Sequence, residues 1–406
     1  MARSAESLSP RLVESIVRLG TWMPFERVPA ELAFFTGVVI DVDTARRLTE
    51  QAGAALVRLE LAEVERLERE QPEAPAGPAV QQLSADGAMV PLVRGEWAEV
   101  KTVAVGTVSQ ERPPTGAVGG HTHDISDCSR LADHETFGRL ALGELHRRGT
   151  PTAGVVVGVM DGSEWLQGFL DLHRPDAVRI LDFPHAVEHL AAAAQASFGS
   201  GTLLATTWLE DQRHTLRHGE VAEVLAAVCR LPTPLATDPV HAEVVRDQTL
   251  TYLVKRWEQI QYAVFAQQGY PLGSGMVESA NKLVVEARLK GSGMHWARVN
   301  VNPLVALRAM VCRDRWEASW PRIGRQLREQ SATRRRQRRA AKTVAATVVP
   351  SATPVLQQPA PPGVDPPVVA LRRVPTIVNG RPTARHPWKR PLLAAGRHHN
   401  AAHAKS

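Results

Sequence analysis

The sequence predicts an α/β domain with a mixed sheet, preceded by a helical N-terminal region and followed by a disordered basic tail. Short runs rich in β-branched residues alternate with helix-like segments between residues 80 and 181, as in sheets with crossover connections. A long stretch without strand candidates comes next, and Pro- and Ala-rich sequence ends the chain. With 406 residues, 44% of them hydrophobic, the chain can bury more than one core.

Residues 1–78 are the first predicted region, and their pattern is helical. Asp43 or Thr44 can cap a long helix in which leucine and valine recur at helical spacing. The segment PEAPAGP, residues 72–78, ends this helix and is a linker by composition.

Residues 79–322 are the second predicted region. Leu83–Leu92 and Val100–Val108 are expected to pair as strands, and we interpret the polar segment His121–Cys128 as a loop rather than a metal cluster. Ala153–Met160 is a continuous β-branched run, which is typical of a strand buried on both faces. The other expected elements are two helices and a strand: His134–Arg148, Ser163–Leu172 and Ala177–Leu181.

From His185 to about Gln268 the pattern is helical throughout, and a helix is expected at Met276–Leu289 after a glycine-rich turn. The tail, residues 323–406, is predicted to be disordered because it cannot bury enough apolar surface. From residue 331 onward it holds 14 Lys and Arg but one acidic residue, whereas the first 330 residues hold 34 basic and 41 acidic side chains. The high pI therefore belongs to the tail and says nothing about DNA binding by the folded body.

Composition also excludes several classes of protein. The N-terminal sequence has no apolar run of the kind found in secretory signals. The longest apolar stretch, Ala153–Met160, is shorter than the roughly 18 residues that span a membrane. Three cysteines are too few for a disulfide framework. We therefore expect a soluble cytoplasmic protein without a membrane partner.

Three acidic residues have a context that suits metal-dependent chemistry. Asp86 lies in a predicted strand, Asp161 ends the most hydrophobic strand, and Glu278 lies near the start of a helix. Neighbouring strands lie about 4.8 Å apart, so such side chains can hold ions roughly 4 Å apart. Carboxylate oxygens favour Mg²⁺ or Mn²⁺. The alternatives are a simple Asp-Gly turn and a glutamate that complements a helix dipole.

Asp182 and His185 form a second candidate pair after the strand Ala177–Leu181. His185 can donate to a catalytic carboxylate or lie near a scissile phosphate. Alternatively, Asp182 is the N-cap of the following helix, and both roles are compatible.

The segment Gly273–Trp296 contains side chains suited to phosphate. Asn281, Lys282, Arg288 and Lys290 are the candidate contacts to a nucleic-acid backbone. The alternative is an amphipathic helix with a solvated basic face.

Several separated blocks of this sequence resemble, in the same order, those of bacterial insertion-sequence transposases of the ISKra type, which are relatives of the Mutator-like DDE transposases. The blocks are DGAMVPL with GEWAEVK, VMDGSEWL, RILDFPHAVEHL and YPLGSGMVESANKLVVEARLKGSGMHW. The resemblance covers roughly Leu8 to Trp320, including LSPRLVESIVRLGTWMPFERV near the start.

The resemblance implies an RNase H-like fold with an all-helical insertion at about residues 190–268. It implies that a catalytic Asp, Asp and Glu hold two divalent ions, and Asp86 and Glu278 match the first and third positions. In that fold the first and fourth strands are neighbours. Asp161 ends the expected fourth strand, whereas Asp182 ends the fifth, about 10 Å from the first. We therefore choose Asp161 as the second acid, keep Asp182 as the alternative, and assign Asp182 and His185 to the family's Asp-x-x-His motif.

The expected function is transposition: Mg²⁺-dependent cleavage of transposon ends and strand transfer into target DNA by a homo-oligomer on DNA, in the cytoplasm at the nucleoid. Tail arginines, with Arg334, Arg335 and Arg336 among them, are expected to add salt-dependent DNA affinity. Related transposases often begin with paired CxxC motifs, which this sequence lacks. The alternatives are therefore an inactive, truncated DNA-binding remnant and a structure-selective nuclease.

Overall fold

The computed structural model describes residues 8–109, 120–232, 239–347, 377–378 and 381–382. The chain divides into two compact units, Met1–Lys342 and Thr343–Ser406. Within the second unit, the short strands β6 (Ile377–Val378) and β7 (Arg381–Pro382) pair antiparallel. Apart from residues 343–347 at the end of the last helix, the elements described below belong to the first unit.

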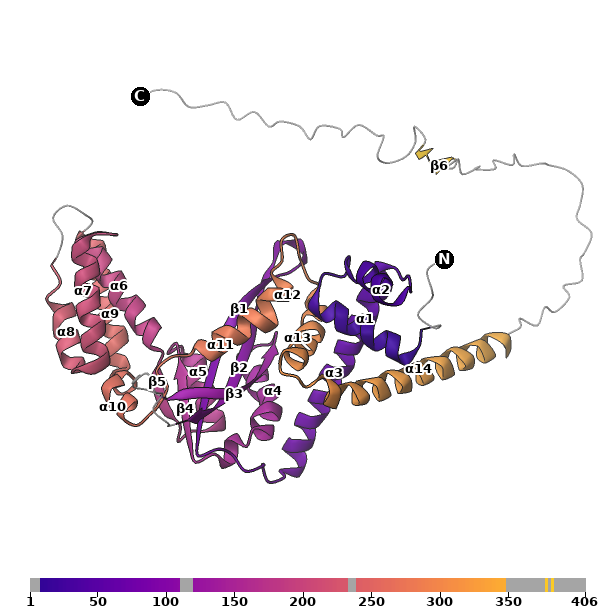
Figure 1. Cartoon of the computed structure of the whole chain (residues 1–406), viewed down its shortest axis with the longest axis horizontal. Coiled ribbons are helices and arrows are strands. Elements are labelled where there is room, and N and C mark those ends of the chain that lie inside the picture. The colour runs from indigo at the N-terminus through magenta and orange to yellow at the C-terminus, as the bar shows by residue number, and fades with distance from the viewer. Residues whose placement is uncertain (1–7, 110–119, 233–238, 348–376, 379–380, 383–406) are drawn as a thin grey trace, which may run out of the picture. The chain divides into compact units, whose positions relative to one another are not determined.

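A five-stranded mixed sheet forms the centre of this unit, in the order β3-β2-β1-β4-β5 (Figure 1). β2 runs antiparallel to both of its neighbours, while β4 is parallel to β1 and to β5. The strands are β1 (Val80–Pro91), β2 (Trp97–Ser109), β3 (His121–Arg130), β4 (Val155–Met160) and β5 (Val178–Leu181). The predicted α/β class and four of the five strands are confirmed.

The prediction of a loop at His121–Cys128 is wrong, because these residues belong to β3. The strand has no apolar alternation, yet Asp127 and Arg130 are buried on it. Asp127 pairs with Arg313 and Arg130 pairs with Glu60, so partners from distant elements offset part of the charge that is buried on this edge strand.

The register of the parallel strands places three acidic residues at one edge of the sheet. Leu83 of β1 lies opposite Gly158 of β4, where the ladder between these two strands ends. Continued by three residues, the same register brings Asp86 level with Asp161. Met160 likewise pairs with Leu181 of β5, so Asp161 and Asp182 follow their strands at the same level.

Helices cover both faces of the sheet. On one face, α4 (His134–Arg147) and α5 (Glu164–His173) bury Phe137 and Phe169 against Leu83 and Met160. On the other face, α11 (Gly275–Ala280) contacts Ala104 of β2 through its apolar side chains. The same helix continues as the π-helix η5 (Asn281–Glu286) and then as α12 (Ala287–Leu289).

The N-terminal region is helical, as predicted. It consists of α1 (Pro10–Trp22), α2 (Val28–Thr36) and α3 (Val42–Glu70). The N-cap of α3 is Asp41, whose side chain accepts a hydrogen bond from the N–H of Thr44, and not Asp43 or Thr44 as predicted. α3 packs on α13 (Arg298–Cys312) so closely that a Cβ on Gly53 would lie 2.2 Å from the carbonyl oxygen of Pro303.

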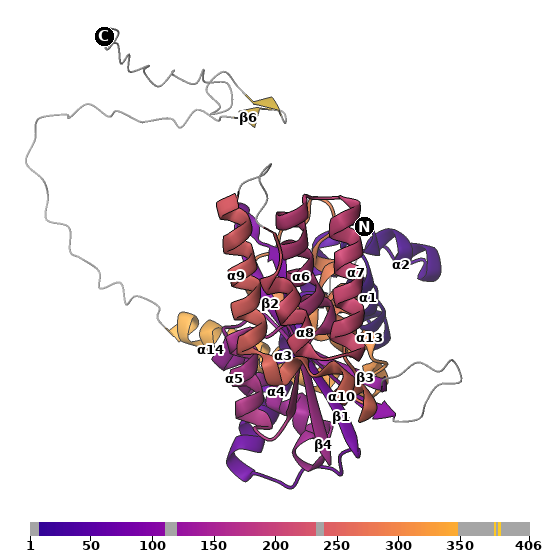
Figure 2. The same cartoon turned by 90° about the vertical axis from the view of Figure 1, so that its left-hand side faces the viewer.

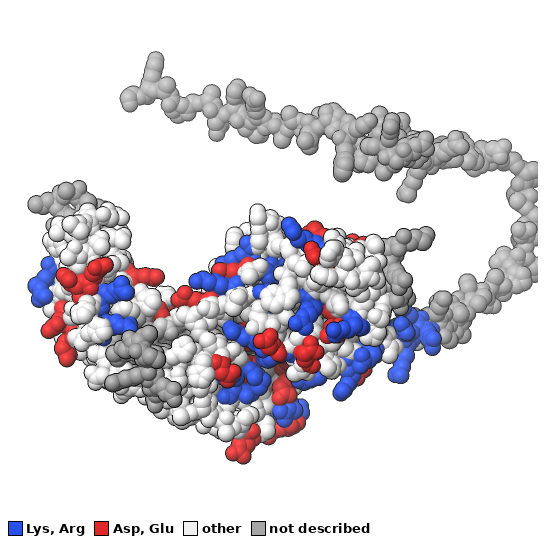
Figure 3. All heavy atoms as spheres, viewed as in Figure 1, with Lys and Arg blue, Asp and Glu red and all other residues white. Residues whose placement is uncertain are grey.

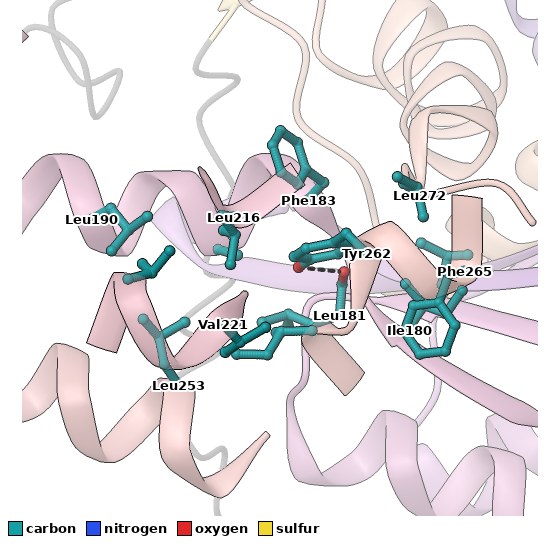
Figure 4. Close-up of a cluster of buried hydrophobic side chains, with 14 of the residues drawn as sticks. Ile180, Leu181, Phe183, Leu190, Leu216, Val221, Leu253, Tyr262, Phe265 and Leu272 are labelled. Atoms are coloured by element: carbon teal, nitrogen blue, oxygen red, sulfur yellow. Dashed lines mark hydrogen bonds between the residues drawn. The ribbon is translucent and has the colours of Figure 1, made fainter. Parts of the chain in front are cut away.

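Between β5 and α11 the described residues form helices only. The four longer ones lie side by side in Figure 2: α6 (Phe183–Phe198), α7 (Leu203–His218), α8 (Val221–Cys229) and α9 (Pro239–Lys255). α10 (Tyr262–Gln267) follows them. Their apolar side chains share one core with Ile180 and Leu181 of β5 (Figure 4). Short turns of helix are η2 (Val93–Gly95), η3 (Thr150–Thr152) and η4 (Trp257–Ile260).

The last helix, α14, extends over Trp316–Thr347. The prediction of disorder is therefore wrong for residues 323–347, which continue this helix past the expected boundary. Arg-rich sequence is compatible with a solvated helix because arginine has high helix propensity. The rest of the tail lies outside the described residues, apart from β6 and β7. None of the helices in the described part of the chain is long and apolar enough to cross a membrane.

Candidate active site

Asp86 lies on the sheet face that α11 and η5 cover. Its Oδ1 accepts a hydrogen bond of 2.7 Å from the N–H of Gly87, and its Oδ2 accepts one of 2.9 Å from Nδ2 of Asn281. Burial raises the pKa of Asp86, and the negative charge of Asp161 raises it further, against the opposing effects of these bonds and of His185. Asp86 and Asp161 therefore repel each other within one partly desolvated site.

Asp161 directly follows β4 and begins a tight turn. Its Oδ1 accepts a hydrogen bond of 2.8 Å from the N–H of Ser163. The next residue, Gly162, has φ of +82°, a conformation that glycine adopts without steric cost. The turn fixes the Asp161 side chain at the carboxyl end of the strand, where ligands bind in open α/β sheets.

Asp182 is fully buried, and both of its oxygens have partners. Oδ1 accepts a hydrogen bond of 2.6 Å from the N–H of Ser274, and Oδ2 accepts bonds from the N–H and Nδ1 of His185 at 3.1 and 2.8 Å. Burial alone would raise the pKa of Asp182, but these bonds bring it below its usual value. Asp182 is thus the N-cap of α6, one of the two roles considered for it.

His185 is held by this buried carboxylate. The hydrogen bond and charge of Asp182 raise the pKa of His185 to about 9, so the imidazole is a cation at neutral pH. Because Nδ1 is bound to Asp182, Nε2–H is the donor that remains. The negative charge of Asp161 also acts on this imidazole.

Glu278 lies on α11, one turn before Asn281. Its side chain is 44% exposed, and its Oε2 is 4.0 Å from Nζ of Lys282. Among the described residues, no three or more His, Cys, Asp or Glu side chains are grouped so as to hold a metal ion. The structure thus brings Asp86, Asp161, Asn281 and His185 together, and leaves the carboxylate of Glu278 directed to Lys282.

Asn281 was predicted to contact a nucleic-acid backbone, but its side chain is buried, with 5% exposed, and its Nδ2 donates to Asp86. Its Oδ1 is buried without a hydrogen-bond partner. Asn281 begins the π-helix, a feature that is often found at functional sites. The guanidinium of the buried Arg308 donates to the carbonyl oxygen of Leu283 inside this π-helix.

The basic residues of this segment divide into exposed and buried ones. Lys282 and Lys290 are exposed, and Lys290 pairs with Glu286 at 2.6 Å. Arg288, in contrast, is 2% exposed, so the expectation of a phosphate contact does not suit its position. Its guanidinium donates to the carbonyl oxygen of Gly20 at 3.1 and 3.3 Å.

Aromatic rings explain how the charge of Arg288 is buried. The guanidinium carbon lies 4.8 Å from the ring centroid of Phe25 and 5.1 Å from that of Trp296, and cation–π attraction replaces part of the lost hydration. Burial still lowers its pKa to about 10.

The arginines predicted to bind DNA from the tail, Arg334, Arg335 and Arg336, are exposed on α14. Figure 3 shows Lys and Arg side chains along the described part of this helix.

The oxygen donors of the site suit Mg²⁺ or Mn²⁺. The carboxylates of Asp86 and Asp161 share a partly buried site, and Oδ1 of Asn281 has no hydrogen-bond partner. The N–H of Ser163 donates to Oδ1 of Asp161 and not to Oδ2. A divalent cation would neutralise the repulsion that raises the pKa of Asp86.

Sequence reasoning missed Tyr252, Arg256, Ser274 and Arg308, all of which support this site through backbone atoms. Such contacts depend on tertiary structure, and neither spacing nor residue type signals them in the sequence. Comparison of the chain with protein-family models and with curated proteins finds no match.

Proposed function

We propose that this protein is a DDE-type transposase of the ISKra kind, which cleaves transposon ends and joins them to target DNA. The observation that carries the proposal is the placement of Asp86 and Asp161 on adjacent parallel strands, close enough for one charge to raise the pKa of the other. The helix that bears Glu278 is connected to Asp86 by the hydrogen bond that Asn281 donates to the Asp86 carboxylate.

The sheet supports an RNase H-like assignment. The order β3-β2-β1-β4-β5 with β2 alone antiparallel, and with helices on both faces, agrees with the arrangement that the sequence resemblance implies. The helices between β5 and α11 occupy the place of the expected insertion.

Asp86, Asp161 and Glu278 would hold Mg²⁺ or Mn²⁺, and Glu278 would do so after its flexible side chain turns away from Lys282. When bound, the ions would activate a water or a 3′-OH and stabilise charge at phosphorus. His185, kept cationic by Asp182, would direct Nε2–H to a phosphate oxygen, and Asn281 would orient Asp86. Lys282, Lys290 and the arginines of α14 would contact the DNA backbone without reading its sequence.

The test is cleavage and joining of duplexes taken from the DNA on either side of this reading frame, with Mg²⁺ or with EDTA. Wild type is expected to yield joined product, whereas Asp86→Asn, Asp161→Asn and Glu278→Gln each lose at least a thousandfold in rate. Asp176→Asn is the control, because that carboxylate is exposed and pairs with Arg174.

A second candidate is a DNA-binding protein that has lost catalysis. The observation that favours it is that Glu278 approaches Lys282, and that no three acidic or other metal-binding side chains are grouped among the described residues. DNA binding by wild type without any Mg²⁺-dependent cleavage would support this candidate and contradict the transposase. Cleavage without joined product would instead indicate a nuclease.

A further inference from the structure

The turn that carries Asp161 is held from outside the sheet by the end of α9. The hydroxyl of Tyr252 donates to the carbonyl oxygen of Asp161 at 2.6 Å, and Nη2 of Arg256 donates to that of Gly162 at 2.6 Å. Two consecutive carbonyl groups are thus bound by residues about ninety positions later in the chain.

The two donors are themselves fixed in place. The ring of Tyr252 is stacked on His189 of α6 at 3.7 Å between centroids, and the guanidinium of Arg256 lies 3.8 Å from the centroid of the Tyr252 ring. Nη1 of Arg256 also donates to the carbonyl oxygen of Tyr252 at 3.0 Å. Burial raises the pKa of Tyr252 to about 12, so its hydroxyl keeps its proton.

Gly162 is the residue that allows this approach. A Cβ at this position would lie 2.3 Å from Nε of Arg256, which is so close that the Arg256 side chain or the turn would have to move. The positive φ of the turn and the close approach of the guanidinium therefore require glycine for two separate reasons.

Further contacts join the same elements. Lys255 pairs with Glu164 of α5 at 2.9 Å, and Gln259 donates to Gln167 at 3.3 Å. Tyr262 repeats the arrangement on the neighbouring strand, because its hydroxyl donates to the carbonyl oxygen of Leu181 at 2.9 Å (Figure 4). The helices between β5 and α11 thus contact the carboxyl ends of both β4 and β5 through tyrosine hydroxyls.

We propose that Tyr252 and Arg256 are positioning residues, which hold the Asp161–Gly162 turn so that the Asp161 carboxylate stays at the level of Asp86. The metal-binding part of this inference rests on the proposed function. On this proposal, the helices between β5 and α11 support the candidate active site, in addition to any contact with DNA.

Tyr252→Phe removes the hydroxyl and keeps the stacked ring. The matched control is Thr249→Val on the same helix, which removes a buried hydroxyl that donates to the carbonyl oxygen of His189 at 3.2 Å. Arg256→Lys is a second variant, which keeps the charge and changes the donor geometry.

Three measurements on the full chain separate positioning from stability. Without metal, amide hydrogen exchange in residues 160–166 is expected to become about five-fold faster in Tyr252→Phe, since one neutral hydrogen bond is lost. Mn²⁺ binding, followed by electron paramagnetic resonance, is expected to weaken by a similar factor. The Mg²⁺ concentration for half-maximal cleavage is expected to rise about five-fold, while Thr249→Val leaves all three values near wild type.

Equal exchange rates and equal Mn²⁺ affinity in Tyr252→Phe, Thr249→Val and wild type would overturn the positioning role, whatever the cleavage activity. If exchange and Mn²⁺ binding change as expected while wild type cleaves no DNA, the positioning role stands and the proposed transposase activity fails. If Arg256→Lys alone exchanges faster, Tyr252 has no positioning role and this part of the inference is wrong.

Discussion

Replacement of Asp86 by asparagine should make the metal-free protein more stable while it abolishes the proposed DNA cleavage. In the folded state the Asp86 carboxylate is partly desolvated and repelled by Asp161, which is why its pKa is raised. Asparagine has nearly the same shape without the charge. Such a gain is expected where a charge is held in an unfavourable environment, as it is at sites that trade stability for activity.

The hydrogen bonds of the site allow this exchange without loss. Oδ1 of the new asparagine can still accept from the N–H of Gly87. Its amide nitrogen would face Nδ2 of Asn281, but rotation of the Asn281 amide presents Oδ1, which has no partner in the wild type. Two hydrogen bonds are therefore kept, and only the cost of burying the charge and the repulsion from Asp161 disappear.

The expected gain is about 1 kcal/mol, or roughly 1.5 °C in Tm for a unit of this size. It should be present above the folded-state pKa of Asp86 and vanish below about pH 4, where the wild-type side chain is also neutral. With Mg²⁺ at ten times its Kd the wild type gains about 1.4 kcal/mol, so the order of the two proteins should reverse.

Thermal unfolding in EDTA and in Mg²⁺, monitored by circular dichroism, tests this reasoning. Asp176→Asn serves as the control with the opposite sign, because Arg174 lowers the pKa of that exposed carboxylate. A lower Tm for Asp86→Asn than for wild type in EDTA would refute the assignment of Asp86 to a repulsive, partly desolvated pair.

Asp182→Asn should lower the free energy of unfolding by about 2 kcal/mol and should also lower the pKa of His185. Asp161→Asn, in contrast, should not reduce the free energy of unfolding. Urea unfolding measures the stability of the two variants, and an NMR titration of the imidazole measures the pKa of His185. Because the folded pKa of His185 is raised to about 9, its stabilising effect should be complete below pH 6.5 and disappear as the pH rises through 9. Since its side chain is 40% exposed, we expect this effect to be about 1 kcal/mol, seen as a fall in unfolding free energy that His185→Gln lacks. Arg288→Met should reduce Tm but leave the salt dependence of DNA binding unchanged, whereas Lys290→Ala should reduce the slope of log K against log salt by about 1. A reduced slope for Arg288→Met would contradict the burial of Arg288, and an unchanged slope for Lys290→Ala would contradict its contact with DNA.

The strands were predictable where their faces are apolar. Val157, Val159 and Met160 are buried on β4, and their run of hydrophobic residues identified both the strand and the acid that follows it. β3 could not be recognised, since its buried residues are Ser126, Asp127, Ser129 and Arg130. Asp127 and Arg130 are buried together with ionic partners from distant elements, Arg313 and Glu60, which no local pattern reveals.

The acidic residues of the candidate site could be predicted from the sequence, but the residues that hold them in place could not. Asp86 and Asp161 could be paired only with the strand order that the family resemblance implies, in which the first and fourth strands are neighbours. The π-helix at Asn281 could not be foreseen, since the sequence has ordinary helical periodicity there. The burial of Arg288 could not be foreseen either, since it depends on Phe25, which lies in the turn between α1 and α2, more than two hundred and fifty residues earlier.

The contact between Arg288 and Gly20 has a consequence for how the protein unfolds. It connects α1 to the helix that bears Asn281 across the linker at residues 72–78, so the N-terminal helices and the sheet share one buried guanidinium. Separation of these parts would leave that cation without its acceptor and without one of its two aromatic rings. Residues 1–78 and 79–322 should accordingly melt in a single cooperative transition, and a fragment that starts at residue 79 should not reach the native state on its own.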